Sequence, residues 1–306
     1  MDYSIIGQSS VLMHALARAD RAAQSGARVL LTGETGTGKE MLARRIHAAS
    51  ARATKPFVAL NCASLSPELM ESELFGHVKG AFTTALRDHG GLVAQADGGT
   101  LFLDEIAEMT TPLQAKLLRF IETGEYRRVG DAQLRRADVR LISATHRDLR
   151  GHDFRDDLYY RLAVVVIAMP PLRHRADDIP LLVAHFLDMI AAREKRAPMR
   201  ADDAALAALQ RHDWPGNIRE LHNMLYNAAV MNDGTVLTAP MLDLPAPADP
   251  MTLMREAAKP QPLWAVEQAA IDAAIRYCGG NIPHAARLLE VSPSTLYRRP
   301  KSRAQA

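Results

Sequence analysis

The sequence predicts an α/β domain whose parallel sheet carries helices on both faces. A small helical domain follows it, and a small all-α helix-turn-helix domain comes last. Three features of the sequence indicate this order: five short apolar runs alternate with helical segments up to about residue 170, helical patterns alone occupy 177–240, and a proline-rich stretch precedes a helical tail. Apolar runs separated by helices are typical of a parallel sheet that is buried on both sides. We therefore expect domains at 1–170, 171–240 and 263–306, with a linker at 241–262.

The five expected strands lie in the apolar runs 28–33, 56–62, 99–105, 139–145 and 163–169. Helical segments such as "GKEMLARRIHAAS" and "TTPLQAKLLRFIETG" separate them. The stretch 240–262 holds six of the 17 prolines, a density that helices do not tolerate. We therefore interpret it as a semi-extended linker.

Composition excludes several classes of protein. The 306 residues include 37 Lys and Arg against 35 Asp and Glu, so any nucleic-acid contact depends on a local basic patch. Two widely spaced cysteines, outside any CxxC pattern, favour neither a disulfide framework nor a zinc site. The N-terminus lacks the pattern of a signal peptide, and no run of 18 apolar residues occurs. We expect a cytoplasmic protein without membrane contact.

The segment "GETGTGKE" predicts a phosphate-binding loop, because it follows an apolar strand and opens a helix. Glycines allow backbone N–H groups to turn toward phosphate oxygens, and the lysine supplies a charge for the β- and γ-phosphates. The eighth position, usually Ser or Thr for Mg²⁺, is Glu40. The predicted nucleotide-binding residues of the loop are Gly33, Glu34, Thr35, Gly36, Thr37, Gly38, Lys39 and Glu40.

Two acidic residues, Asp104 and Glu105, end the strand "GGTLFLDE". Open α/β sheets bind ligands at this carboxyl edge. Asp104 is suited to coordinating Mg²⁺, and Glu105 to polarising an attacking water molecule. A solvated turn is the alternative, but the phosphate loop upstream favours ATP hydrolysis with Mg²⁺.

Three further residues lie at strand ends beside this predicted site. Asn61 is placed to hydrogen-bond Glu105 and hold it inactive, and Thr145 and His146 are placed to sense the γ-phosphate. An ordinary capping or surface histidine is an equally good interpretation of His146.

Three arginines are candidates for the same chemistry. Arg155 and Arg161 in "FRDDLYYRL" are either surface charges paired with Asp156 and Asp157 or, for at least one of them, an arginine finger that reaches a neighbouring subunit. Arg219, in "WPGNIREL", lies at a helix start suited to touching the nucleotide from the helical domain.

The run "GAFTTA" keeps neither a helical nor a strand period, which predicts an exposed loop with Phe82 at its tip. Exposing an aromatic ring costs free energy unless a partner receives it. The expected contact residues are Gly80, Ala81, Phe82, Thr83, Thr84 and Ala85.

The tail predicts a DNA-binding helix-turn-helix. Ser292 and Pro293 suit the N-cap and N1 positions of a last helix, which follows "IPHAARLLE" after a short turn. Six Lys and Arg against three acids concentrate positive charge at that helix, although a merely solvated basic tail is the alternative. Expected contacts to bases or phosphates come from Ser294, Thr295, Tyr297, Arg298 and Arg299.

Together, "GETGTGKE", "GGTLFLDE", "FRDDLYYRL", "WPGNIREL" and above all "ELFGHVKGAFTTA" resemble the AAA+ domain of sigma-54-dependent transcriptional activators, the bacterial enhancer-binding proteins of NtrC type. The resemblance covers about residues 5–240, and the tail resembles the family's Fis-type helix-turn-helix. Glu40 is the family's usual residue after the loop lysine. Because the resemblance begins near residue 5, it implies an activator that lacks an N-terminal receiver domain.

The resemblance implies a ring, usually a hexamer, that self-associates with ATP between subunits, with dimers as one route to it. It implies that the "GAFTTA" loop contacts sigma-54 RNA polymerase, supported by a second loop around 124–138, while the tail binds double-stranded DNA at upstream sites. Regulation would come from a trans-acting partner protein, hetero-oligomerisation or expression level.

Several residues depart from the family's pattern. His146 stands where Asn is common, Val78 replaces a frequent Glu, and Pro300 ends the last helix early. Thr84 replaces a glycine, which at a positive φ would cost about 1–3 kcal/mol. The alternative function is therefore a DNA-binding AAA+ regulator that no longer engages sigma-54.

Overall fold

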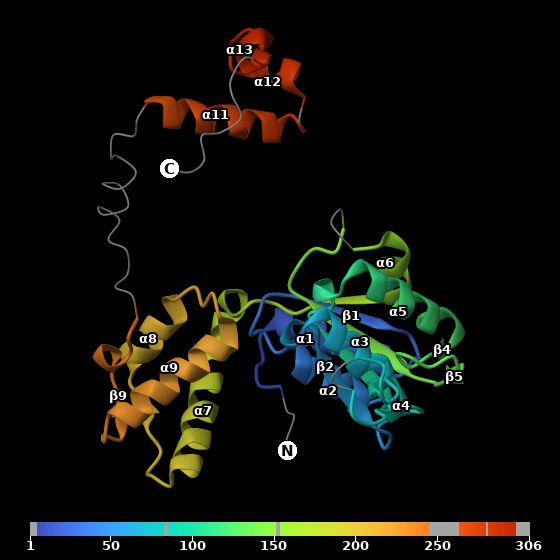
Figure 1. Ribbon diagram of the computed structural model, residues 1–306. Coiled ribbons are helices and arrows are strands. Elements are labelled where there is room, and N and C mark those ends of the chain that lie inside the picture. Colours follow the sequence, from blue (N-terminus) through green and yellow to red (C-terminus); the bar gives the residue numbers. More distant parts are fainter. Residues whose placement is uncertain (1–4, 83–84, 151–153, 245–262, 280, 298–306) are drawn as a thin grey trace. The chain divides into compact units, whose positions relative to one another are not determined.

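A five-stranded parallel sheet forms the centre of the first unit of the chain (Figure 1). The computed structural model describes residues 5–82, 85–150, 154–244, 263–279 and 281–297, and the chain divides into units 1–244 and 245–306. The sheet order is β2-β3-β6-β1-β7, and every neighbouring pair is parallel. The predicted parallel sheet is therefore confirmed, with strands β1 (Val29–Thr32), β2 (Phe57–Asn61), β3 (Thr100–Asp104), β6 (Arg140–Thr145) and β7 (Val165–Ala168).

Alternation along the strands divides the sheet core between its two faces. Leu31, Phe102 and Ile142 pack with α1 (Ser10–Ala23) and α2 (Lys39–Ala48) on one face. Leu101 and Leu141 pack on the other face against α3 (Pro67–Phe75), α5 (Thr111–Thr123) and α6 (Asp156–Leu162). Helices thus cover both faces, as the apolar strands predict.

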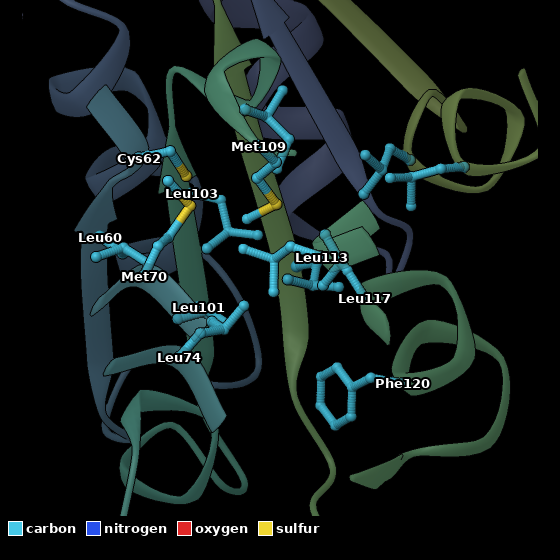
Figure 2. Packing of buried hydrophobic residues seen from close by; sticks show 14 of the residues in the cluster. Leu60, Cys62, Met70, Leu74, Leu101, Leu103, Met109, Leu113, Leu117 and Phe120 are labelled. Atoms are coloured by element: carbon cyan, nitrogen blue, oxygen red, sulfur yellow. The ribbon is translucent and has the colours of Figure 1, made fainter. Parts of the chain in front are cut away.

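Figure 2 shows the second of these faces, where Leu101 and Leu103 project from β3 toward the helices. Met70 and Leu74 come from α3, and Leu113, Leu117 and Phe120 come from successive turns of α5. All of these side chains are buried. A core that is continuous over this face holds the carboxyl ends of the strands in a fixed arrangement.

Shorter elements connect the sheet to its loops. The hairpin β4 (Glu125–Tyr126) and β5 (Arg135–Arg136) follows α5 and lies within the second loop predicted at 124–138. The remaining short elements are η1 (Cys62–Ser64), α4 (Leu92–Gln95), η2 (Ile106–Glu108) and η3 (Leu172–Asp178).

A small helical lid completes the first unit. It contains α7 (Ile179–Glu194), α8 (Asp203–Arg211) and α9 (Asn217–Met231), with η4 (Ala239–Met241) and a parallel pair of short strands, β8 (Arg200–Ala201) and β9 (Val236–Leu237). Trp214 is fully buried in this lid core, and its indole N–H donates to the Leu209 carbonyl. Because Trp214 lies in the turn before α9, its burial in the lid core fixes where that helix begins.

The second unit consists, in its described part, of α11 (Leu263–Tyr277), α12 (Ile282–Leu288) and α13 (Pro293–Tyr297). Asn281 caps α12, because its Oδ1 accepts from the His284 N–H at 3.1 Å. α12 covers the first seven residues of "IPHAARLLE", and Glu290, the last residue of that segment, has a φ of 55°. The helix-turn-helix predicted for the tail is present, with α13 beginning at Pro293 as the cap pattern indicated.

Within the described ranges, no helix is both long and apolar enough to cross a membrane.

Candidate nucleotide site

The loop between β1 and α2 has the backbone that the phosphate-binding motif predicts. Gly33, Gly36 and Gly38 have φ values of 144°, 80° and 98°, conformations that L side chains rarely adopt. A Cβ on Gly33 would also lie 2.7 Å from the Met169 carbonyl oxygen. α2 begins at Lys39, so its N-terminal N–H groups and its positive dipole end lie at this loop.

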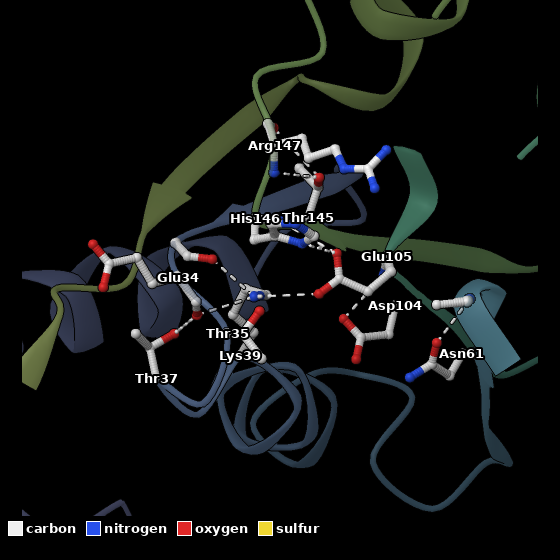
Figure 3. A network of polar contacts seen from close by, with 12 residues as sticks. Glu34, Thr35, Thr37, Lys39, Asn61, Asp104, Glu105, Thr145, His146 and Arg147 are labelled. Carbon is white, nitrogen blue, oxygen red and sulfur yellow. Dashed lines mark hydrogen bonds and ion pairs between the residues drawn. The ribbon is translucent and has the colours of Figure 1, made fainter. Parts of the chain in front are cut away.

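Lys39 is buried beside the loop that it follows (Figure 3). Its Nζ donates to the Gly33 carbonyl at 2.8 Å and the Glu34 carbonyl at 3.2 Å, and lies 3.8 Å from Glu105 Oε1. Burial lowers the pKa of Lys39, against the raising effect of Glu105. A polyphosphate would supply the negative charge that this desolvated ammonium lacks.

Asp104 and Glu105 lie at the carboxyl end of β3, where they line the same cavity as Lys39. Burial, and then the Glu105 carboxylate, raise the pKa of Asp104. Glu105 has a left-handed backbone, with φ and ψ both 51°, and its N–H donates to Asp104 Oδ1 at 3.1 Å. Such a conformation costs about 1–3 kcal/mol in a non-glycine residue and is common where a side chain must be aimed at a site.

His146, and not Asn61, is the residue that bonds Glu105 (Figure 3). His146 Nδ1 lies 2.6 Å from Glu105 Oε2. In the described part of the chain Asn61 makes no hydrogen bond to Glu105; its Oδ1 accepts from the Ala63 N–H at 2.9 Å, which fixes the amide in the η1 turn. The predicted Asn61–Glu105 contact is therefore wrong for this structure, although both side chains line the cavity. His146, delivered by the turn after β6, bonds the Glu105 carboxylate in its place.

The other predicted loop and sensor residues divide between the cavity and its surroundings. Thr35, Gly36, Thr37, Gly38 and Glu40 line the cavity, as does Arg219 of α9. Glu40 also bonds Arg44 one turn along α2, with an Nη2–Oε1 distance of 2.7 Å. Thr145 is buried and exchanges hydrogen bonds with the Arg147 backbone, so it supports the turn that carries His146.

Glu34 joins the phosphate loop to the lid instead of lining the cavity. Its two carboxylate oxygens accept from Arg173 at 2.6 and 2.8 Å, and Oε2 also accepts from Asn217 Nδ2 at 3.1 Å. These bonds lower the pKa of Glu34 to about 2. We call Glu34, Arg173 and Asn217 the lid clasp.

Backbone contacts reinforce the lid clasp. The Ile218 N–H donates to the Gly36 carbonyl at 3.0 Å, and a Cβ on Gly36 would lie 2.3 Å from the Gly216 carbonyl oxygen. Asn217 is fully buried, and its Oδ1 accepts from the Leu172 N–H at 2.7 Å. The start of α9 therefore follows the position of the phosphate loop closely.

The cavity has a volume of about 710 Å³, and one part of its wall is apolar. The sequence pattern does not indicate this part, since a lid residue that faces a cavity follows the same helical period as one that faces the core. A ligand with a planar, uncharged ring at one end and phosphates at the other fits this shape. The ring would lie against the apolar wall, and the phosphates would reach the glycine loop. The apolar lining residues are Ile5, Ile6, Met41, Ala63, Met169, Leu182, Phe186, Met189 and Ile218.

The two candidate finger arginines form ion pairs within the chain. Arg155 Nη2 lies 2.7 Å from Asp157 Oδ2, and Arg161 Nη2 lies 3.0 Å from Glu122 Oε1. Neither arginine lines the cavity that holds Lys39 and Glu105. Both pairs are substantially exposed, so a stronger anion can displace either carboxylate.

The sequence pattern suggested that Phe82 is exposed at the tip of its loop, but the structure does not place it there. It is half-buried, and its ring lies edge-on to the His77 ring with centroids 4.9 Å apart. The loop closes through bonds from the Gly80 N–H to the Ala85 carbonyl and from the Ala85 N–H to the Phe82 carbonyl. Thr83 and Thr84 lie outside the described residues.

The second loop contacts the stem of the first. The Val78 N–H donates to the Val129 carbonyl at 3.1 Å, and the Val129 N–H donates to the Gly76 carbonyl at 2.8 Å. Arg128 pairs with Asp88 of the first loop and with Asp131 of its own loop. Residues 76–89 and 126–136 are thus held together at their bases.

Among the predicted DNA-contact residues, Ser294 is the one whose side chain the structure describes. Ser294 is exposed on α13, and its Oγ lies 2.6 Å from Ser292 Oγ. The side chains of Thr295 and Tyr297, together with all of Arg298, Arg299 and Pro300, lie outside the described part.

Three family models match the chain in the order of its parts. The "Sigma-54 interaction domain" matches residues 5–168, the "AAA+ ATPase lid domain" matches 173–252, and the "Bacterial regulatory protein, Fis family" model matches 262–301. The first model alone covers more than half of the chain. The chain belongs to the family of sigma-54-dependent transcriptional activators.

Relatives of this activator include the regulatory protein LuxO of Vibrio cholerae, 45% identical over 310 residues that cover 96% of the chain and 68% of LuxO. The transcriptional regulatory protein ZraR of Escherichia coli is 47% identical over 298 residues, which cover 96% of the chain and 67% of ZraR. A crystal structure of NtrX from Brucella abortus in complex with ATP superposes with a TM-score of 0.75 at 34% identity, covering 96% of the chain and 68% of NtrX. These likenesses span the AAA+ core, lid and tail of the activator.

The lid clasp of the activator gives a prediction of its own. We expect Glu34→Gln and Arg173→Ala each to lower the free energy of unfolding slightly, because the pair is bidentate but exposed. Thermal unfolding of both single variants and the double variant measures this. The double variant should lose no more than either single one, whereas fully additive losses would show that the two residues act independently.

The pKa of Glu34 sets the pH range of this effect. A carboxyl whose folded pKa is lowered to about 2 from 4.5 stabilises the fold above pH 4.5. That contribution is lost progressively as the pH falls toward 2. Arg200→Ala, which removes an exposed pair with Asp188 of α7, is the matched control and should leave stability nearly unchanged.

Proposed function

We propose that this activator binds and hydrolyses ATP between the subunits of a ring, and that hydrolysis drives the loop 80–85 to remodel a closed complex of sigma-54 RNA polymerase. The observation that carries this proposal is the convergence of Lys39, Asp104, Glu105 and Arg219 on one cavity of about 710 Å³. The same cavity is apolar along the lid, as a nucleotide base requires. The ATP bound in the NtrX structure supports the same ligand class here.

The donor groups of the cavity fit Mg–ATP. Backbone N–H groups of the glycine loop and the Lys39 ammonium would hold the phosphates, and the Asp104 carboxylate is a hard oxygen ligand suited to Mg²⁺. When bound, Mg²⁺ would neutralise charge that develops on the phosphate oxygens. Glu40 lines the cavity but pairs with Arg44, so we assign the metal to Asp104 alone among the acidic side chains.

Glu105 would orient and polarise the attacking water. Its carboxylate contacts both Lys39 and His146, and these two contacts restrain it in this conformation. When phosphates engage Lys39, the Lys39–Glu105 attraction weakens and the carboxylate becomes available to a water molecule. His146 then has the restraining role that the sequence suggested for Asn61.

The lid clasp would transmit the state of the phosphate loop to the lid. Glu34 lies between Gly33 and Gly36 of the phosphate loop, and it is bonded to Arg173 at the start of the lid and to Asn217 at the start of α9. Arg219 lies two residues further along α9 and lines the cavity. A shift of the loop on hydrolysis would therefore move the Arg219 helix.

Phe82 must leave His77 before it can contact a partner. The ring–ring contact with His77 holds it against the stem of its loop, and Arg128 links that stem to the second loop. We propose that hydrolysis releases this packing and presents Phe82 and Thr83 to sigma-54. The helix-turn-helix at 263–297 would hold the ring at upstream DNA sites through α13 and the basic residues after it.

The Thr84 side chain decides between this function and the alternative of a DNA-binding regulator that does not engage sigma-54. We expect the natural protein and Thr84→Gly both to form open promoter complexes with sigma-54 polymerase and ATP, because every other part of the site is present. Permanganate footprinting of the promoter measures the melted region. Activity in Thr84→Gly alone would favour the alternative, and no open complex from either protein despite normal ATP hydrolysis would reject the activator proposal.

A further inference from the structure

A second cavity, which is polar and has a volume of about 440 Å³, lies at the amino ends of the strands, opposite the phosphate loop. It is formed where the chain enters β1 and β6: Arg28 immediately precedes β1, and Arg140 begins β6. Phe120 and Ile121 of α5 and Val164, which precedes β7, supply apolar wall. The nucleotide site uses the carboxyl ends of these strands, and this cavity uses their amino ends.

Arg140 is a buried arginine in the wall of this cavity, with an exposed fraction of 4%. Its two terminal nitrogens donate to the carbonyls of Ala22 and Ala23 at the C-terminus of α1, at 2.7 and 3.2 Å. Its Nε is buried and has no hydrogen-bond partner in the described part of the chain. Helix carbonyls therefore compensate its charge only in part.

Arg28 is less well satisfied. Its Nε is likewise buried without a partner, and its guanidinium forms no ion pair with any residue that the structure describes. Burial, and then the nearby Arg161, lower the pKa of Arg28. A cation beside another cation, with no carboxylate of its own, is an unfavourable arrangement in a partly desolvated place.

Arg52, the third arginine that lines the cavity, has its hydrogen-bond donors and its charge matched by partners within the chain. Arg52 makes a bidentate pair with Asp138, at 2.9 and 3.0 Å, and donates to the Gly99 and Asp138 carbonyls. Asp138 is the one carboxylate among the lining residues, and Arg52 occupies it. The cavity thus presents two guanidinium groups, those of Arg28 and Arg140, without a carboxylate to match.

We propose that this cavity binds an oxyanion of the phosphate class, with Arg28 as its principal ligand. A guanidinium presents parallel N–H donors that match two phosphate oxygens, and the volume of the cavity is ample for a phosphate group. The phosphate has two conceivable sources, a free small molecule or the nucleotide carried by a neighbouring subunit. The second source rests on the proposed ring, whereas the first does not.

The first arm of the test uses the Lys39→Ala protein, in which the nucleotide site has lost its phosphate-binding cation. Isothermal titration calorimetry with inorganic phosphate, at constant ionic strength, should show one saturable site. Arg28→Gln in the same background should weaken binding about tenfold or more, since a charged bidentate contact is lost. Arg21→Gln, which removes an exposed arginine of α1 outside the cavity, is the matched control and should bind as before.

Thermal unfolding shows that a loss of binding is not a loss of fold. Phosphate should raise the melting temperature of the Lys39→Ala protein and of Arg21→Gln in that background, and should not raise that of Arg28→Gln. Without phosphate, Arg28→Gln should be at least as stable as its parent, because an unpaired, partly buried charge has been removed. A strongly destabilised Arg28→Gln would contradict the proposal by showing that Arg28 is already satisfied within the chain.

The second arm tests the neighbouring nucleotide as the source. Lys39→Ala subunits, which retain Arg28, are mixed with Arg28→Gln subunits, which retain Lys39, and ATP turnover is measured. Turnover above that of Arg28→Gln alone would assign the phosphate to the neighbour's nucleotide, while binding of inorganic phosphate in the first arm assigns it to a free anion. If Arg28-dependent phosphate binding and recovery of turnover are both absent, the proposal is overturned. The calorimetric arm needs neither ATP nor polymerase, so it stands or falls independently of the proposed function.

Discussion

Glu105→Gln should bind ATP and lose about 10²–10⁴ of its turnover, because general-base or water-orienting catalysis typically contributes that factor. The amide keeps the size of the carboxylate and can still bond His146, so the loop and the left-handed backbone at this position should persist. What it removes is the negative charge that would polarise water. Steady-state phosphate release gives the turnover, and a fluorescent ATP analogue gives the affinity.

The matched control for this change is Glu108→Gln. Glu108 lines the same cavity but its carboxylate pairs with Arg147 at 2.6 Å, so it is committed to the turn after β3. We expect Glu108→Gln to keep turnover within a few-fold of the natural protein. Retained hydrolysis in Glu105→Gln, or an equal loss in Glu108→Gln, would remove Glu105 from its proposed role.

The sheet was predictable because each strand is short, apolar and bounded by helical segments. β2 runs from Phe57 to Asn61 inside the predicted run 56–62, and β6 runs from Arg140 to Thr145 inside 139–145. The phosphate loop was predictable for a related reason, since its chemistry depends on glycines and a lysine that are contiguous in the chain. Local sequence suffices where the geometry is local.

The lid clasp was not predictable from sequence, because its partners are distant. Glu34 and Arg173 are 139 residues apart, and Asn217 is a further 44 residues along the chain. Nothing in the residue types distinguishes Arg173 from Arg175, the other arginine of "PPLRHRADDIP". Pairing of this kind depends on where α9 and η3 pack against the loop, which only the folded lid determines.

Competition for hydrogen bonds explains the correction at Asn61. The residue types permit an Asn61–Glu105 contact, and β2 and β3 do bring Asn61 beside Asp104 in register. The η1 turn nevertheless offers the Ala63 N–H to Asn61, while the next strand, β6, delivers His146 to Glu105. Phe82 is a similar case, since His77 lies five residues earlier and accepts a ring that the local pattern left exposed.

Arg155→Ala and Arg161→Ala have an expected effect at least as large as that of Glu105→Gln. If either arginine reaches the γ-phosphate on a neighbouring subunit, its removal should lower turnover by about 10³–10⁵, the factor typical of an arginine finger. In the single chain each forms an exposed ion pair, Arg155 with Asp157 and Arg161 with Glu122. An exposed pair contributes little to stability, so it can open when a phosphate is offered.

The carboxylate partners separate the two interpretations of these arginines. If an arginine only stabilises its own chain, Asp157→Asn or Glu122→Gln should reproduce the loss seen when that arginine is removed, because each breaks the same pair. If the arginine acts on a neighbour, its carboxylate variant should keep turnover within a few-fold, since it frees the guanidinium instead of deleting it. Mixing the inactive arginine variant with Glu105→Gln subunits should then restore turnover at the interfaces that combine an intact Glu105 with an intact arginine. Recovery requires two subunits at one site, and its absence for both arginines would place the catalytic cation elsewhere in the activator.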